Sequence, residues 1–125
     1  VYGRLPLMIT ENCLVQNETG CRLDRQGPCV PEDGPCRCGQ PNVLVDRTGA
    51  AFPLLPAYGH RTEIQNSKPL YLADRPEHRR LGLAYARLRF TTETAEECVS
   101  VVQNYLDAAP AAGDFTRGLY ERGVE

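Results

Sequence analysis

The chain has 125 residues, a formal net charge of −2 and 24% charged residues, a composition typical of one ordinary soluble domain over residues 1–125. It lacks the basic excess that drives nucleic-acid binding through counterion release, so a nucleic acid is not expected as a main partner. No apolar run reaches the roughly 20 residues of a membrane-spanning helix, and we expect a cytoplasmic protein without a membrane partner.

Residues 1–9 are rich in β-branched and large apolar side chains and predict a strand. Gly3 and Pro6 favour an edge position, a bulge or an early end for it. The sequence already reads as the interior of a strand at Val1. We therefore expect the chain to be an excised C-terminal fragment of a longer protein.

Residues 10–40 form a Cys-rich segment without helical or strand periodicity, and we expect a loop that sulfur chemistry holds in place. Its cysteines are separated by gaps of seven, seven, six and one residues: Cys13, Cys21, Cys29, Cys36 and Cys38. None of these gaps is the two-residue spacing of a zinc knuckle, so the spacing does not identify a metal. Ligation of a metal or an iron-sulfur cluster, disulfides in an oxidising compartment, and plain free thiols all stay open.

Residues 42–56 predict a β-hairpin, because two apolar runs flank a turn that begins with Asp46 and ends with Gly49. His60 follows the hairpin and is a candidate nitrogen ligand or an ordinary surface histidine. Residues 60–65 predict another extended segment, and residues 69–73 predict a short buried strand.

Residues 69–109 predict a βαβα unit. A first short helix begins with Asp74 and Glu77, which suit a capping box, and ends near Gly82. Residues 84–90 alternate between apolar and polar side chains and predict a half-buried strand with parallel pairing.

The second helix of this unit begins with a capping box of Thr94 and Glu97 and ends at Pro110. Its Cys98 lies on the apolar stripe, where a small buried hydrophobe is the expected role. Together with the hairpin, these elements predict the α+β class, with a mixed sheet, a C-terminal βαβα unit and a Cys-rich loop.

No hydrolytic site is complete in the sequence. Nucleophiles, bases and orienting groups exist, but no spacing links them into a triad. The candidates are Cys13 or Ser67 as nucleophile, His60 or His78 as base, and Glu11, Asp46 or Glu63 as orienting group.

Several sequence blocks taken together resemble the collagenase-like peptidase family U-32. The blocks are GRLPLMITENC (3–13), DRTGAAFP (46–53), GHR (59–61), NSKPLYLAD (66–74), RLRFT (87–91) and FTRG (115–118). The resemblance covers nearly the whole chain and implies the Cys-containing region that follows a barrel-like α/β domain. That upstream domain of the same chain, and a protein substrate, are the partners implied.

The same resemblance implies a set of metal ligands. Cys13 matches the first family cysteine, Cys21 a second, and Cys36 or Cys38 a later one. His60 stands where the family commonly has a further cysteine, and a site of three cysteines and one histidine is chemically possible. Alternatively, Cys29 or the spare member of the Cys36 and Cys38 pair is the fourth ligand, or the site has been lost.

Three functions follow as expectations. The first is a C-terminal domain of a U-32 peptidase that supplies a cysteine platform for an iron-sulfur cluster or zinc, without being a complete enzyme on its own. The second is a structural or substrate-recognition module without metal. The third, implied by other family members, is part of an oxygen-independent, iron-sulfur-dependent hydroxylase acting on RNA or a quinone precursor.

Overall fold

A computed structural model describes residues 1–19, 37, 40–75 and 77–120. The chain divides into two compact units: unit 1 comprises Val1–Leu5 and Lys68–Glu125, and unit 2 comprises Pro6–Ser67. The sequence predicts one domain over residues 1–125, and within it the contacts form these two units. The α+β class is confirmed, since one sheet and helices account for the regular structure in the described residues.

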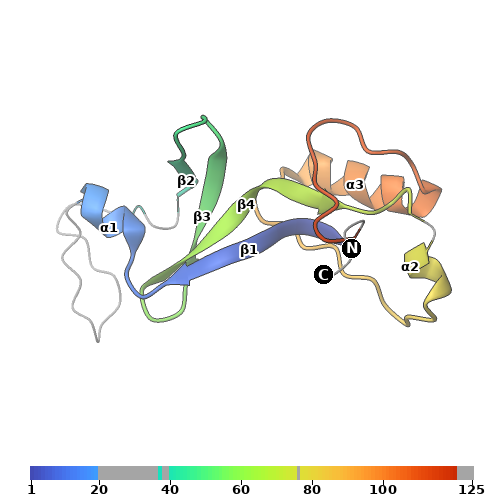
Figure 1. The fold of residues 1–125 in the computed structure, drawn as a ribbon, viewed down its shortest axis with the longest axis horizontal. Helices are drawn as coiled ribbons and strands as arrows, with labels where there is room; N and C mark the ends of the chain where they lie inside the picture. The colour runs from blue at the N-terminus through green and yellow to red at the C-terminus, as the bar shows by residue number, and fades with distance from the viewer. Residues whose placement is uncertain (20–36, 38–39, 76, 121–125) are drawn as a thin grey trace. The chain divides into compact units, whose positions relative to one another are not determined.

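The sheet has four strands in the order β1-β4-β3-β2 (Figure 1). The predicted N-terminal strand is present as β1, Tyr2–Thr10. It runs antiparallel to β4, Arg61–Tyr71, because Thr10 bonds Thr62 at one end while the Tyr2 and Tyr71 rings meet at the other. Both of these strands contribute residues to both units.

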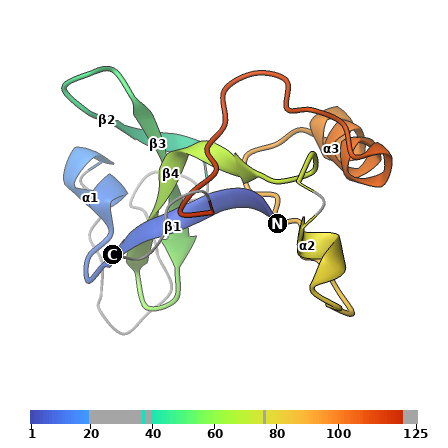
Figure 2. The same ribbon diagram turned by 45° about the vertical axis from the view of Figure 1, so that its right-hand side comes forward.

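The predicted hairpin is confirmed as β2, Asn42–Val45, and β3, Ala51–Ala57, with Val45 opposite Ala51 (Figure 2). In the turn, the Asp46 carboxylate accepts hydrogen bonds from the Thr48 N–H at 2.7 Å, the Thr48 hydroxyl at 2.7 Å and the Ala50 N–H at 3.0 Å. These hydrogen bonds lower the pKa of Asp46, and the bond from the Thr48 hydroxyl has the largest effect. The turn residues therefore fix the register of the hairpin locally.

β4 is one continuous strand, whereas the sequence predicts separate extended segments at 60–65 and 69–73. Pairing with β3 ends at Leu54 and Ile64, so the missing N–H of Pro69 lies beyond that ladder and breaks no bond in it. The Pro69 carbonyl instead accepts the N–H of Thr116 at 2.9 Å. β4 thus pairs with β3 in its first half and with the segment around Thr116 in its second half, where the proline is tolerated.

The predicted βαβα unit over 69–109 is only partly formed. Its first strand is the end of β4, and both of its helices are present. The prediction of a strand over 84–90 is wrong. That segment has a single isolated parallel bridge, between Leu88 and Tyr2. The parallel component of the predicted mixed sheet is thus limited to isolated bridges, of which Leu70 to Thr116 is another.

The short predicted helix is present as α2, Glu77–Arg80, followed by Gly82 at φ 66°. The long one is α3, Ala95–Asp107, whose capping box of Thr94 and Glu97 is confirmed. This helix ends earlier than Pro110, because Ala108 adopts the left-handed conformation at φ 53°.

A further helix, α1, Leu14–Thr19, occupies the start of the segment that the sequence predicts to be an irregular loop. Residues 20–36 and 38–39 of the Cys-rich segment, with Cys21, Cys29, Cys36 and Cys38, lie outside the described residues. None of the helices in the described part of the chain is long and apolar enough to cross a membrane.

The core of unit 1 is built from aromatic rings around Ala73, which is 1% exposed. The Tyr2 ring lies 5.5 Å from Phe90 and 6.2 Å from Tyr105, and the Tyr71 ring lies 5.5 Å from Tyr105. In unit 2 the buried apolar side chains among the described residues include Cys13, Val15, Leu54 and Ile64. Each unit therefore has its own small core.

Candidate functional site

Cys13 is the one predicted ligand from the Cys-rich segment that the described residues contain. It lies between the end of β1 and the start of α1, it is 8% exposed, and its thiol is free. Its carbonyl accepts the N–H of Gln16 at 3.3 Å in the first turn of the helix. A buried, unbridged thiol at this point is held by backbone structure on both sides.

Two threonines fix the chain on either side of Cys13. Thr62, at the start of β4, accepts the Leu14 N–H on its hydroxyl at 3.0 Å. Thr10 donates its hydroxyl to the Asn12 carbonyl at 2.6 Å and receives the Thr62 N–H at 3.3 Å. Thr62 is only 2% exposed, so these bonds form in a place largely without competing water. The position of Cys13 is thereby tied to β4.

His60 lies in the turn between β3 and β4, at φ 58° and half-buried. The next residue, Arg61, forms an ion pair with Glu11 at 3.1 Å. Because Glu11 precedes Cys13 by two residues and Thr62 bonds Leu14, His60 and Cys13 lie at the same end of the β1 and β4 pair within unit 2. The structure thus brings a thiol and an imidazole to one end of the sheet.

The remaining predicted ligands, Cys21, Cys36 and Cys38, are outside the described residues. Within the part that is described, no group of three or more His, Cys, Asp or Glu side chains forms a metal-binding cluster. Cys98, on α3, is a free and half-buried thiol of unit 1. It therefore belongs to a different unit from Cys13.

The carboxylates considered as orienting groups have structural contacts instead. Glu11 pairs with Arg61, Asp46 holds the hairpin turn, and Glu63 accepts the side-chain amide of Gln65. These contacts are with an arginine, with the turn residues and with a side-chain amide. The contacts seen for these three carboxylates are therefore structural ones.

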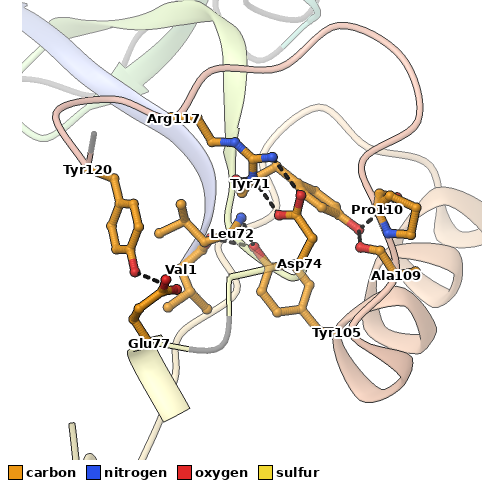
Figure 3. A network of polar contacts seen from close by, with 10 residues as sticks. All are labelled: Val1, Tyr71, Leu72, Asp74, Glu77, Tyr105, Ala109, Pro110, Arg117 and Tyr120. Carbon is orange, nitrogen blue, oxygen red and sulfur yellow. Dashed lines mark hydrogen bonds and ion pairs between the residues drawn. The ribbon is translucent and has the colours of Figure 1, made fainter. Parts of the chain in front are cut away.

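Unit 1 contains a network of polar contacts centred on an Arg and Asp pair (Figure 3). Arg117 donates to both carboxylate oxygens of Asp74 at 2.6 Å and to the Tyr71 carbonyl at 2.7 Å. Its guanidinium also lies 4.6 Å from the centre of the Phe115 ring. The side chains of Arg117 and Asp74 are 17% and 25% exposed, so this pair is partly desolvated.

Tyrosine hydroxyls connect the ends of several elements in the same network. Tyr105 accepts the Leu72 N–H at 2.8 Å and donates to the Val1 carbonyl. Tyr71 donates to the Ala109 carbonyl just beyond α3 at 2.9 Å. Figure 3 shows these side chains converging on the chain between β4 and α2. The network therefore joins the N-terminus, β4 and α3.

The protonation states of this network follow from burial and charge. The Arg117 hydrogen bonds hold the pKa of Asp74 below its usual value, against the opposite effect of desolvation. Burial raises the pKa of Tyr105 to about 12. Burial also raises the pKa of Tyr71, and the negative charge of Asp74 raises it further. At neutral pH the pair is charged and the phenols are protonated, which is the state that forms the observed bonds.

A polar cavity of about 470 Å³ lies in unit 1 next to this network. In it, Tyr2 donates to Glu93 at 3.1 Å, and Glu93 also accepts the Thr91 N–H at 2.7 Å. Desolvation would raise the pKa of Glu93, but these donors, together with the N–H groups of Thr92 and of Glu93 itself, hold the pKa below its usual value. The described lining includes no histidine or cysteine.

Comparison with protein-family models, curated proteins and solved structures finds no match for this chain. Its function must therefore be inferred from its own residues.

Two long-range contacts of these sites were not predicted from the sequence. It assigns Asp74 to a helix cap, whereas its carboxylate binds Arg117, 43 residues away. It also gives no role to Thr10 and Thr62, which are separated by 52 residues. No local signal in the sequence links either pair, because the partners are 43 and 52 residues apart.

Proposed function

We propose that this chain is a C-terminal domain of a U-32 protein that presents Cys13, with further cysteines, as a platform for an iron-sulfur cluster or zinc. The observation that carries the proposal is the free thiol of Cys13, which is 8% exposed and anchored by the Thr62 and Leu14 contact. A thiol that is buried, unbridged and rigidly held is suited to ligation, because little conformational entropy is lost when a metal binds.

The donor set fits soft-metal chemistry. Sulfur from Cys13 and nitrogen from His60 lie at the same end of the β1 and β4 pair, and thiolate with imidazole is a combination that zinc and iron-sulfur centres accept. The remaining ligands would come from Cys21 and from Cys36 or Cys38. The centre would supply Lewis-acid or electron-transfer chemistry to an active site built largely outside this chain.

Anaerobic purification of the chain and of two matched variants tests the proposal. We expect brown protein with absorbance at about 400 nm and bound iron, or colourless protein with bound zinc. Cys13→Ser should lose most of the bound metal, whereas Cys98→Ser should keep it, because Cys98 belongs to unit 1. Limited proteolysis should also cleave residues 10–40 faster in Cys13→Ser than in Cys98→Ser.

Three results would contradict the metal platform. They are metal-free wild-type protein, no loss of stability on chelation, and equal protease protection of residues 10–40 in both variants. Together they would support a metal-free recognition module. That second function is favoured by the exposed apolar side chains of unit 1, which include Leu83, Tyr85 and Leu106 at 61%, 92% and 69% exposure.

A further inference from the structure

The segment between α2 and α3 has the sequence of a strand but not the surroundings of one. Residues 81–87 are all exposed, although they include Leu81, Leu83 and Tyr85. Apolar and polar side chains alternate from Ala84 to Phe90. This pattern is typical of a half-buried strand, in which one face packs against other side chains and the edges pair with neighbouring strands.

One edge of this segment pairs with β1. The Tyr2 N–H donates to the Arg87 carbonyl at 3.4 Å, and the Arg89 N–H donates to the Tyr2 carbonyl at 3.0 Å. In a parallel bridge of this kind, the residue between the two bonded ones directs its N–H and C=O to the opposite side. That residue is Leu88, and its backbone groups have no hydrogen-bond partner among the described residues.

The contact with β1 also makes the open edge rigid. Gly3 lies at φ 125°, and a Cβ atom there would be 2.3 Å from the Arg89 carbonyl oxygen. Only glycine permits this approach, and the two hydrogen bonds with Tyr2 hold the segment against β1. The backbone groups of Leu88 are thus presented at a fixed position.

An apolar groove of about 390 Å³ lies between this segment and α3. Its floor and walls include Leu83, Ala86 and Leu88 from the segment and Val102 and Leu106 from the helix. Val102 and Leu106 are 42% and 69% exposed. An added strand would place every second side chain over this groove and bury these residues.

The charges at the edge favour an acidic partner. Arg87 is exposed, and its guanidinium has no ion pair among the described residues. A second copy of this chain would suit the edge poorly, because an antiparallel pairing centred on Leu88 would place Arg87 directly opposite Arg89 of the other copy. Like charges directly opposite are destabilising, whereas Asp or Glu in those places would be favourable.

We propose that the open edge of residues 84–90 binds an extended segment in which apolar residues alternate with Asp or Glu. Its backbone pairs with the N–H and C=O of Leu88, its apolar side chains enter the groove against α3, and its carboxylates face Arg87. This site lies in unit 1 and does not depend on the metal platform of unit 2.

Fluorescence anisotropy with two labelled synthetic heptapeptides tests the site, one alternating Val with Glu and the other Val with Lys. We expect the Glu peptide to bind at least about tenfold more tightly than the Lys peptide. Ala86→Pro should weaken Glu-peptide binding about tenfold or more. In an extended segment the N–H of Ala86 faces the same open side as that of Leu88, and proline removes it without removing either bond to Tyr2. Arg87→Glu should reverse the preference between the two peptides.

Arg47→Glu, in the exposed turn of the hairpin, is the matched control and should leave both affinities unchanged. Equal binding of both peptides, or undiminished binding by folded Ala86→Pro, would overturn the proposal. So would tighter binding of an amphipathic helical peptide, or a dimer in sedimentation that Ala86→Pro abolishes. If Ala86→Pro does not fold by circular dichroism, the charge reversal at Arg87 decides the question.

Discussion

The pair of Arg117 and Asp74 gives the most direct test of how unit 1 is held together. Arg117→Met keeps the aliphatic stem but removes both bonds to Asp74 and the bond to the Tyr71 carbonyl. Exposed pairs contribute about 0–1 kcal/mol, and breaking a buried pair costs about 3–5 kcal/mol. With Arg117 17% and Asp74 25% exposed, we expect the variant to lose about 2–3 kcal/mol.

Thermal and urea unfolding, followed by circular dichroism, measure this loss. For a chain of this size, it corresponds to a decrease in Tm of roughly 6–15 °C. Lys68→Met is the matched control, because Lys68 pairs with Asp114 at 2.8 Å in the same unit while their side chains are 47% and 78% exposed. The control should lose less than about 1 kcal/mol. Equal losses in the two variants would refute the reasoning that burial makes the Asp74 pair stronger.

The same pair predicts a pH dependence of known sign. The pKa of Asp74 is lower in the folded chain than in the unfolded chain, because Arg117 favours its charged form. The resulting stability is fully present above the unfolded pKa of Asp and is lost as the pH falls through the folded pKa. The stability difference between wild type and Arg117→Met should therefore narrow in acid, and a difference that widens there would contradict this assignment.

Three further variants test other parts of the fold, each by thermal unfolding. Tyr105→Phe removes the hydroxyl that receives the Leu72 N–H and should cost about 1–2 kcal/mol. Gly3→Ala places a Cβ atom 2.3 Å from the Arg89 carbonyl oxygen at φ 125°, and should cost more than about 2 kcal/mol or prevent folding of unit 1. Thr94→Ala removes half of the α3 capping box and should cost about 1 kcal/mol.

Each of these variants has a control in the same chain. Tyr85→Phe changes a side chain that is 92% exposed and should leave the Tm unchanged. Gly49→Ala also places alanine at a positive φ, 86°, but in open space, so its cost should stay near about 1 kcal/mol. Ser100→Ala, which removes an exposed hydroxyl from the middle of α3, is the control for Thr94→Ala. If a control were as destabilising as its partner variant, the specific contact would not be the cause.

The sequence by itself determined the elements whose signals are local. Asp46 and Gly49 define the hairpin turn, and Thr94 and Glu97 begin α3, because in each case the hydrogen-bond partners lie within four residues. The sequence also selected Cys13 as a ligand candidate from its position in the Cys-rich segment. Such features need no knowledge of the rest of the chain.

Only the tertiary structure decided which side chains meet across long separations. It placed Asp74 on Arg117 instead of on a helix cap, and it anchored the residues around Cys13 through Thr62. It also left residues 84–90 with one bridge in place of a ladder, although their alternation is that of a strand. The physical reason is that alternation specifies which faces a segment can bury, whereas a strand exists only where a neighbouring backbone supplies its hydrogen bonds.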